Sequence, residues 1–182
     1  MNRVERSETR PPPAPKTVPH HPSMNERPEL SDPRTPRILT EVQVMFFDTD
    51  CAAVVHNLAY LRFIETARTL LAEQLGMGLV EMAQSKLFPV VARTEIDYRK
   101  PAGLGDKLVV DGWLESLDRT RFWCAFEVRR TSDSAVMVCA RQMLALVQMP
   151  AGKPVRLPAD WSEKYQHLVK SKRGGASSEE AL

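Results

Sequence analysis

The chain has few cysteines, no long apolar run and almost no net charge, and each shortage argues against a class of protein. Its three cysteines, at positions 51, 124 and 139, are odd in number and far apart, which argues against a disulfide framework or a cysteine-based zinc site. No apolar run approaches the ~18 residues of a membrane-spanning helix, because charges interrupt even the segment 57–75. We therefore expect no membrane insertion and no metal.

The chain also has little net charge and lacks the sequence pattern of a secretory signal. The net charge of +2 comes from residues 1–37, which hold seven Lys or Arg against five acids, so the rest of the chain is neutral. A neutral domain argues against nucleic acid as a partner, since phosphate binding needs a concentrated basic face. The opening residues MNRVERSETRPPPAPKTVPHHP lack the apolar stretch of a secretory signal. Together with the unpaired cysteines, this predicts a cytoplasmic protein.

Proline divides the chain into three parts. Residues 1–37 contain nine of the fourteen prolines and no apolar run, which predicts a disordered tail. Residues 38–150 carry the periodic apolar patterns of a folded domain. Residues 151–182 form a C-terminal extension, in which LPADWSEKYQHLV predicts a short helix before a flexible end.

Five stretches alternate with the period of half-buried strands: residues 40–47, 88–99, 106–117, 121–130 and 135–148. In the first stretch Val42, Val44 and Phe46 share one face, and Asp48 follows directly. The short polar turn at 118–120 predicts a hairpin between its two neighbours. Because the later connections are also short, the sheet should be antiparallel, since a parallel crossover needs about a dozen residues.

One helix is predicted between the first two strands. Apolar residues cover more than half of its circumference over residues 58–75, which indicates a largely buried helix, and Gly76 and Gly78 end it. The fold class is therefore α+β, with a five-stranded antiparallel sheet wrapped around one long central helix. Such a sheet leaves an edge or a face uncovered, so we expect at least a dimer.

The stretch DTDCAAVVHNLAYLRFIETART, with the later DYRKPAGLGDKLVV, resembles the hot-dog-fold acyl-CoA thioesterases of the 4-hydroxybenzoyl-CoA thioesterase type, including the Tol-Pal-associated bacterial members. The resemblance covers residues 38–150. It implies a hot-dog fold, an acyl-CoA substrate without a cofactor, and a site at a subunit interface in a homodimer or homotetramer. Coenzyme A and acyl carrier protein both stay open as the thiol carrier.

The resemblance also implies roles for individual residues. The catalytic acid of the family corresponds to Asp50, and the backbone N–H that polarises the thioester carbonyl corresponds to Asn57. Two departures accompany the match. Ala52 and Ala53 stand where the family has at least one glycine, which makes the turn freely, and Asn57 replaces a histidine or an aromatic residue.

The spacing of these residues suits thioester hydrolysis in its own right. The reaction needs a base or nucleophile beside the carbonyl carbon and donors aimed at the developing oxyanion. A helix N-terminus supplies unpaired N–H groups and the positive end of a dipole, and Asn57 is a favoured N-cap type. The loop 51–56 can therefore hold Asp50 against the helix start, where the carboxylate activates water or attacks the carbonyl itself. A simple turn cap is the alternative reading of the two acids.

The neighbours of Asn57 have both a functional and a structural reading. His56 is a proton shuttle, a substrate contact or a helix cap. Tyr60 is a substrate neighbour or a core residue, and Val55 is expected to contact the substrate.

Charged residues outside the loop are also ambiguous. Glu65 is a second carboxylate or a partner of Arg62 or Arg68, three residues away on either side. Four basic residues hold the phosphates of coenzyme A or are solvated residues at strand ends: Arg99, Lys100, Arg129 and Arg130.

Two other functions fit parts of the sequence. VMFFDTD is a hydrophobic strand that ends in two acids, as in magnesium-dependent phosphohydrolases of the haloacid dehalogenase type, with GDKLVVD as the later acidic motif. Ala52 stands where that family has Thr or Val, and the antiparallel pattern disfavours its parallel sheet. A hot-dog module that binds an acyl thioester, or another protein, without catalysis is the remaining alternative.

Overall fold

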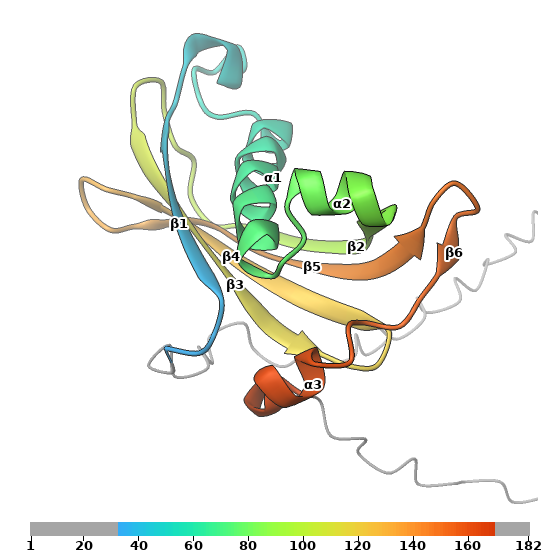
Figure 1. The fold of residues 1–182 in the computed structure, drawn as a ribbon. Coiled ribbons are helices and arrows are strands. Elements are labelled where there is room, and N and C mark those ends of the chain that lie inside the picture. Colours follow the sequence, from blue (N-terminus) through green and yellow to red (C-terminus); the bar gives the residue numbers. More distant parts are fainter. Residues whose placement is uncertain (1–32, 170–182) are drawn as a thin grey trace, which may run out of the picture.

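The computed structural model of the chain describes residues 33–169. Helices and strands follow one another in this part of the chain as drawn in Figure 1: β1 (Arg37–Gln43), η1 (Phe46–Asp48), α1 (Asn57–Gln74), α2 (Leu79–Ser85), β2 (Leu87–Tyr98), β3 (Lys107–Leu117), β4 (Arg121–Arg130), β5 (Val136–Gln148), β6 (Lys153–Pro154), α3 (Trp161–Lys164) and η2 (Gln166–Leu168).

The strands form one antiparallel sheet in the order β1-β3-β4-β5-β2, with β6 paired to the end of β5. Figure 1 shows this sheet curling around α1. The predicted α+β hot-dog arrangement is confirmed. The predicted count of five strands was one too low, because the two-residue β6 pairs with Val147 and Gln148. A strand of two residues is too short to show an alternating pattern.

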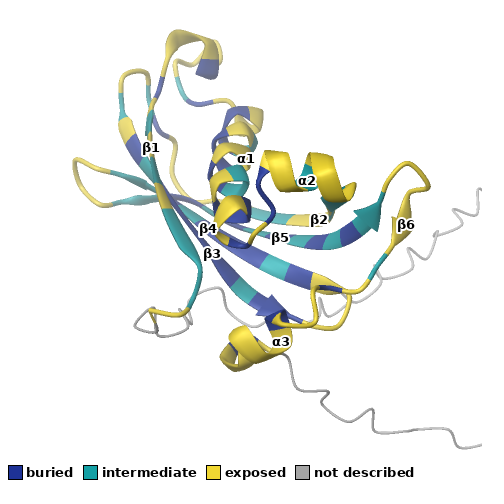
Figure 2. Cartoon of the chain, viewed as in Figure 1, coloured by how far each residue is buried: buried dark blue, intermediate teal, exposed yellow. Residues whose placement is uncertain are grey.

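The core lies between α1 and the concave face of the sheet. Phe63, Ile64, Ala67 and Leu71 form the buried side of α1, and the dark stripe on the helix in Figure 2 faces the strands. Burying each large apolar side chain contributes roughly 1.5–3 kcal/mol. The helix ends where predicted, because Gly76 adopts a left-handed backbone conformation with φ of 74°. The central helix is thus held by packing along its whole length.

The first strand ends earlier than predicted. β1 pairs with β3 only as far as Gln43 and Lys107, so the chain beyond Gln43 has no strand beside it. The N–H of Met45 donates to Asp48 Oδ2 at 2.9 Å, and the chain turns into η1. Phe46, expected on the inner face of a strand, is consequently 81% exposed.

The seven-residue helix α2 was not predicted. It begins after Gly78 and ends at Ser85, and the following Lys86 caps it with a left-handed φ of 57°. Its length is below the ten or more residues over which helical periodicity can be distinguished. Figure 1 shows α2 beside the C-terminal end of α1, and Figure 2 shows that its outer surface is exposed.

The sheet continues slightly beyond the predicted domain limits. The N–H of Leu114 donates to the carbonyl oxygen of Pro36 at 3.0 Å, so the residues just before β1 already contact the sheet. At the other end, α3 buries Trp161 against Phe122, with ring centroids 5.4 Å apart. Residues 1–32 of the predicted disordered tail (1–37) lie outside the described residues, and so do residues 170–182 of the C-terminal extension. Arg37, the last residue of the predicted tail, is the first residue of β1. No helix in 33–169 combines the length and the hydropathy needed to cross a bilayer.

Candidate active site at the start of the central helix

Asp50 lies on a tight loop between η1 and α1. Its backbone N–H donates to the carbonyl oxygen of Val54 at 2.9 Å, and its Oδ1 accepts the N–H of Ala52 at 2.8 Å. Ala53 completes the turn with φ of 57°, a left-handed conformation that glycine adopts freely and that costs energy for a residue with a side chain. The Asp50 side chain is exposed, so one of its carboxylate oxygens is fixed by the loop while the group stays open to solvent.

The helix cap differs by one residue from the prediction. His56, rather than Asn57, is the N-cap of α1, and its Nδ1 accepts the N–H of Leu58 at 3.2 Å. Asn57 is the first helical residue, and its Oδ1 accepts the same Leu58 N–H at 3.0 Å. Since Nδ1 acts as an acceptor, the proton of neutral His56 belongs on Nε2. Both side chains therefore serve as caps in this arrangement.

The backbone N–H of Asn57 is the available donor at this helix end. Among residues 33–169 it has no hydrogen-bond acceptor, whereas the neighbouring N–H groups of His56 and Ala59 donate to Asp48 O at 2.8 Å and His56 O at 2.9 Å. A free N–H at a helix N-terminus carries a partial positive charge and attracts anions. The position predicted for the oxyanion donor thus has the hydrogen-bonding capacity that the role requires.

Asp48, the first of the two acids, is structural. Its carboxylate is 2% exposed and forms an ion pair with Arg62 from the second turn of α1. Its carbonyl oxygen accepts the N–H of His56 at 2.8 Å. Asp48 therefore ties the loop to the helix at two points, and the two acids have different environments despite their spacing.

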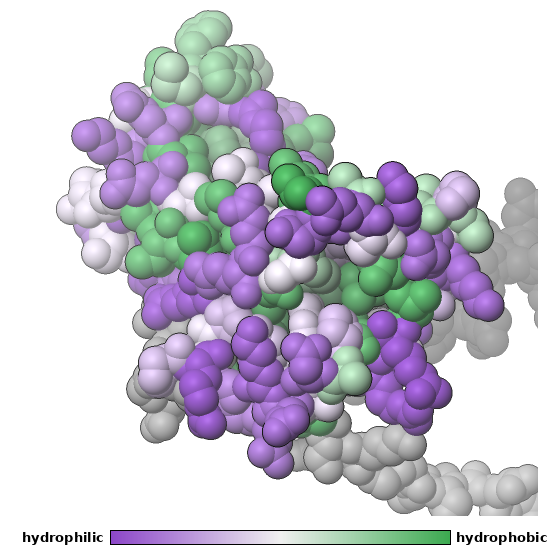
Figure 3. Space-filling model, in the orientation of Figure 1, coloured by the Kyte–Doolittle hydropathy of each residue, from purple (hydrophilic) through white to green (hydrophobic). Residues whose placement is uncertain are grey.

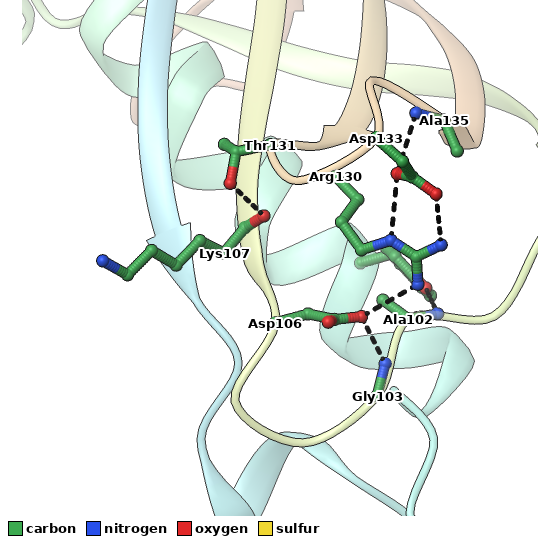
Figure 4. Close-up of polar contacts among 9 residues, drawn as sticks. Ala102, Gly103, Asp106, Lys107, Arg130, Thr131, Asp133 and Ala135 are labelled. Carbon is green, nitrogen blue, oxygen red and sulfur yellow. Dashed lines mark hydrogen bonds and ion pairs between the residues drawn. The ribbon is translucent and has the colours of Figure 1, made fainter.

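A second loop braces the first. The N–H of Val55 donates to Ala102 O at 2.8 Å, and Val54 forms a β-bridge with Gly103. Figure 4 shows how this second loop is held, with Asp106 Oδ2 accepting from the Gly103 N–H at 2.9 Å and from Arg130 Nη1 at 3.3 Å.

Arg130 connects this second loop to the turn between β4 and β5. Its Nη2 also donates to Asp133 at 2.7 Å, and hydrogen bonding from Arg130, followed by that from the Ala135 N–H, holds the pKa of Asp133 at about 2. The chain 102–106 is thus fastened to the β4–β5 turn on one side and to the Asp50 loop on the other.

Tyr60 and Val55 belong to the core of this region. The Tyr60 hydroxyl accepts the N–H of Ala102 at 3.0 Å, and burial raises the pKa of Tyr60, partly offset by that hydrogen bond. The Val55 side chain is buried in the same cluster. The contacts that Tyr60 and Val55 make are structural, and a contact of either residue with a substrate stays a prediction.

The structure places the remaining predicted residues at different distances from the helix start. Glu65 lies two turns further along α1 and pairs with Arg68 at 3.4 Å, so it is not brought to Asn57. Arg99 and Lys100 are exposed directly after β2, and their backbone N–H groups donate to Met137 O at 2.8 and 3.2 Å. They follow Tyr98, whose hydroxyl donates to the carbonyl oxygen of Asn57 at 3.2 Å.

Tyr98 is a site residue that the sequence did not reveal. Its ring lies edge-on to Tyr60, with centroids 6.0 Å apart, and burial raises its pKa. An aromatic residue at the end of an alternating strand was a weak signal, since its contact with Asn57 joins positions 41 residues apart. In the described part of the chain, no group of His, Cys, Asp or Glu side chains could hold a metal ion.

Comparison with known proteins gives consistent matches over this region. The thioesterase-like superfamily matches residues 44–165. The acyl-CoA thioesterase YbgC of Haemophilus influenzae is 29% identical over 70% of this chain and 93% of its own length. The 1,4-dihydroxy-2-naphthoyl-CoA hydrolase of Thermosynechococcus vestitus is 31% identical over 63% of this chain and 79% of its own.

A solved structure gives the same fold. The crystal structure of Slr0204, a 1,4-dihydroxy-2-naphthoyl-CoA thioesterase from Synechocystis, aligns with a TM-score of 0.63 at 23% identity and covers 72% of this chain and 97% of that one.

Proposed function

Because the chain belongs to the thioesterase-like superfamily, we propose that it hydrolyses acyl-CoA thioesters at the start of α1, with Asp50 as the catalytic carboxylate and the Asn57 N–H as the oxyanion donor. The names of the relatives, acyl-CoA thioesterase and 1,4-dihydroxy-2-naphthoyl-CoA hydrolase, support a coenzyme A thioester as the substrate class. The observation that carries the proposal is the free N–H of Asn57 at a helix end to which the exposed Asp50 loop is fastened.

The chemistry follows from these two groups. The substrate carbonyl oxygen accepts the Asn57 N–H, and the helix dipole stabilises the charge that develops there. Asp50 removes a proton from water as the water oxygen bonds to the carbonyl carbon. The tetrahedral oxyanion then collapses, the C–S bond breaks, and the thiolate takes up the proton from Asp50. In the alternative route Asp50 attacks the carbon directly, expels the thiolate and forms an anhydride that water hydrolyses.

His56 and the residues after β2 complete the proposed site. With Nδ1 accepting from Leu58, the Nε2–H of His56 is left as a donor, and in the proposed site it donates to the leaving thiolate. Arg99 and Lys100 are exposed next to Tyr98, and this exposure supports a role for them in binding the phosphates of coenzyme A. The Tyr98 hydroxyl holds the Asn57 carbonyl and thereby the first turn of the helix.

A second copy of the chain is part of the proposal. β2 is an edge strand of twelve residues, and an unpaired edge of that length can form hydrogen bonds with a strand of another chain. Phe46, Phe47, Leu58 and Leu104 are exposed near the helix start, and Figure 3 shows apolar surface at the end of the molecule where Figure 1 places η1. We propose that a homodimer or homotetramer covers this surface. Sedimentation velocity tests it, and a monomer at micromolar concentration contradicts it.

The direct test follows thiol release from short-chain, long-chain and aromatic acyl-CoAs. Asp50→Asn keeps the shape of the side chain and removes its charge, so we expect the rate to fall by about 10²–10⁴-fold while acyl-CoA binding persists. Glu163→Gln, at an exposed acid on α3, is the matched control and should leave the rate unchanged. Since Cys51 is exposed, a blank without substrate must be subtracted from the thiol signal.

The other outcomes separate the alternatives. Equal rates in wild type and Asp50→Asn would place the chemistry elsewhere. Binding without turnover in both proteins would contradict hydrolysis and favour the non-catalytic binding module.

A further inference from the structure

A second hollow lies at the other end of α1, away from Asn57. It encloses about 210 Å³ among the C-terminal half of α1, α2, and strands β2, β4 and β5. Leu71, Phe122, Cys124 and Leu144 form its fully buried floor. Its mouth is formed by partly exposed residues of α2 and β2, among them Met82 and Phe88. The hollow is therefore open to solvent on one side and closed on the other.

The floor of this pocket is apolar. Burial raises the pKa of the Cys124 thiol to about 12, so this group is neutral and behaves as a small hydrophobe. An apolar cavity of about 150 Å³ stays free of water and takes up a molecule such as benzene. The pocket, at about 210 Å³, is large enough for a short aliphatic chain or an aromatic ring.

The pocket is separate from the candidate active site. Arg68 lies eleven residues after Asn57, which corresponds to roughly 16 Å along a helix that rises about 1.5 Å per residue. Phe63, Ile64 and Ala67 fill the intervening space between α1 and the sheet and are buried. No acyl chain bound at Asn57 can reach the pocket through that packed core.

Arg68 is the charged residue that lines the pocket in the described chain. Its Nη1 donates to Gln142 Oε1 at 2.7 Å, and Gln142, 4% exposed, is itself oriented by Thr94 at 3.3 Å. The contact with Glu65 is long, at 3.4 Å, and the Glu65 side chain is 65% exposed, so water screens that pair. The guanidinium is thus fixed in direction while its charge is only weakly compensated.

We propose that this pocket binds a monocarboxylic acid with an apolar tail, the tail filling the floor and the carboxylate pairing with Arg68. A guanidinium binds a carboxylate through two parallel hydrogen bonds, and Arg68 retains N–H donors beyond those given to Gln142 and Glu65. If the proposed hydrolysis is correct, acids of this class are also its products. Binding of the product in the pocket then makes the conformation of α2 and of the end of α1 depend on the product concentration.

The test uses protein labelled with ¹³C in the methionine methyl groups and titrated with octanoate. Met77 and Met82 line the pocket, whereas Met45 lies beside Asp48. We expect saturable shifts for Met77 and Met82 and none for Met45. Octanamide, which has the same tail without the charge, should bind at least tenfold more weakly.

Variants separate the roles of charge and volume. Arg68→Met should weaken octanoate binding at least tenfold, whereas Arg93→Met, at an exposed arginine of β2, should leave it unchanged. Ala72→Leu narrows the pocket and should also weaken binding while Arg68 is intact. Equal affinities for octanoate and octanamide, equal binding by Arg68→Met, or uniform shifts at all methionines would overturn the proposal.

The outcome is independent of the proposed reaction. Asp50→Asn should bind octanoate as the wild type does. Shifts at Met77 and Met82 in a protein that hydrolyses no acyl-CoA would refute the proposed function and leave this inference intact. Hydrolysis without those shifts would refute the pocket alone.

Discussion

The guanidinium of Arg62, on the second turn of α1, forms an ion pair with the buried carboxylate of Asp48. The same guanidinium lies 5.2 Å from the ring centroid of Phe47 and 5.8 Å from that of Phe63. One side chain therefore neutralises a buried charge and covers two aromatic rings beside the candidate active site.

Arg62→Met should lower the free energy of unfolding by about 2–3 kcal/mol, because it leaves the Asp48 carboxylate buried without a counter-charge. Methionine keeps much of the apolar contact with the rings. Urea unfolding followed by tryptophan fluorescence measures the loss. Arg93→Met is the control, since Glu95 keeps its second partner Arg141 and the pair with Arg93 should contribute less than about 1 kcal/mol. Equal losses in the two variants would mean that the Asp48 pair adds little.

Ala53→Gly should stabilise the protein by about 0.5–1 kcal/mol. Ala53 has φ of 57°, which costs roughly 1–2 kcal/mol for a residue with a side chain, and glycine removes this strain at some cost in chain entropy. Thermal unfolding measures the difference. Ala52 is outside the left-handed region, so Ala52→Gly should destabilise or have no effect. A gain for Ala52→Gly, or a loss for Ala53→Gly, would show that loop strain does not control stability here.

The main elements of the fold could be predicted because their periodicity is long. α1 begins at Asn57 and was expected at Leu58, and the four longer strands differ from their predicted limits by at most one residue at either end. The end of β1 could not be predicted, since it depends on where its partner β3 begins, at Lys107. The helix α2 was too short to leave a pattern.

The candidate site could likewise be predicted from the sequence only in part. Asp50 and Asn57 could be proposed from the sequence because they lie seven residues apart in one motif. The helix cap was misplaced by one residue, because both His56 and Asn57 offer an acceptor to the Leu58 N–H. Tyr98, Gly103 and Arg130 act through contacts between distant segments, which one sequence does not encode in any local pattern.

Tyr60→Phe should lower the free energy of unfolding by about 1–3 kcal/mol at neutral pH, because the buried N–H of Ala102 loses its acceptor. The variant should also change the response to alkali. The folded state raises the pKa of Tyr60 above that of the unfolded chain, so its contribution is complete below pH ~10 and is lost as the pH rises through the folded pKa.

Urea unfolding between pH 8 and 11 tests this pH dependence, which should be weaker in Tyr60→Phe than in the wild type. Tyr98→Phe is the comparison, because burial also raises the pKa of Tyr98 but its hydroxyl donates to Asn57 rather than accepting from a buried N–H. A larger loss at neutral pH in Tyr98→Phe than in Tyr60→Phe would contradict the assignment.

Arg130→Gln should release the 102–106 loop that braces Asp50. The pKa of Asp133 is about 2 in the folded protein, with the Arg130 hydrogen bond as the largest cause, so the variant should move this pKa upward toward about 3.9. Because the folded pKa is lowered, the contribution of Asp133 to stability is present above the unfolded value and is lost as the pH falls through about 2. Carboxyl ¹³C titration follows Asp133 directly, and amide hydrogen exchange at Gly103 should become faster. Arg119→Gln, at an exposed arginine of the turn between β3 and β4, should leave both unchanged. If Arg130→Gln shifts Asp133 but leaves exchange at Gly103 unaltered, Asp106 holds the brace without Arg130, and the arginine acts on the β4–β5 turn alone.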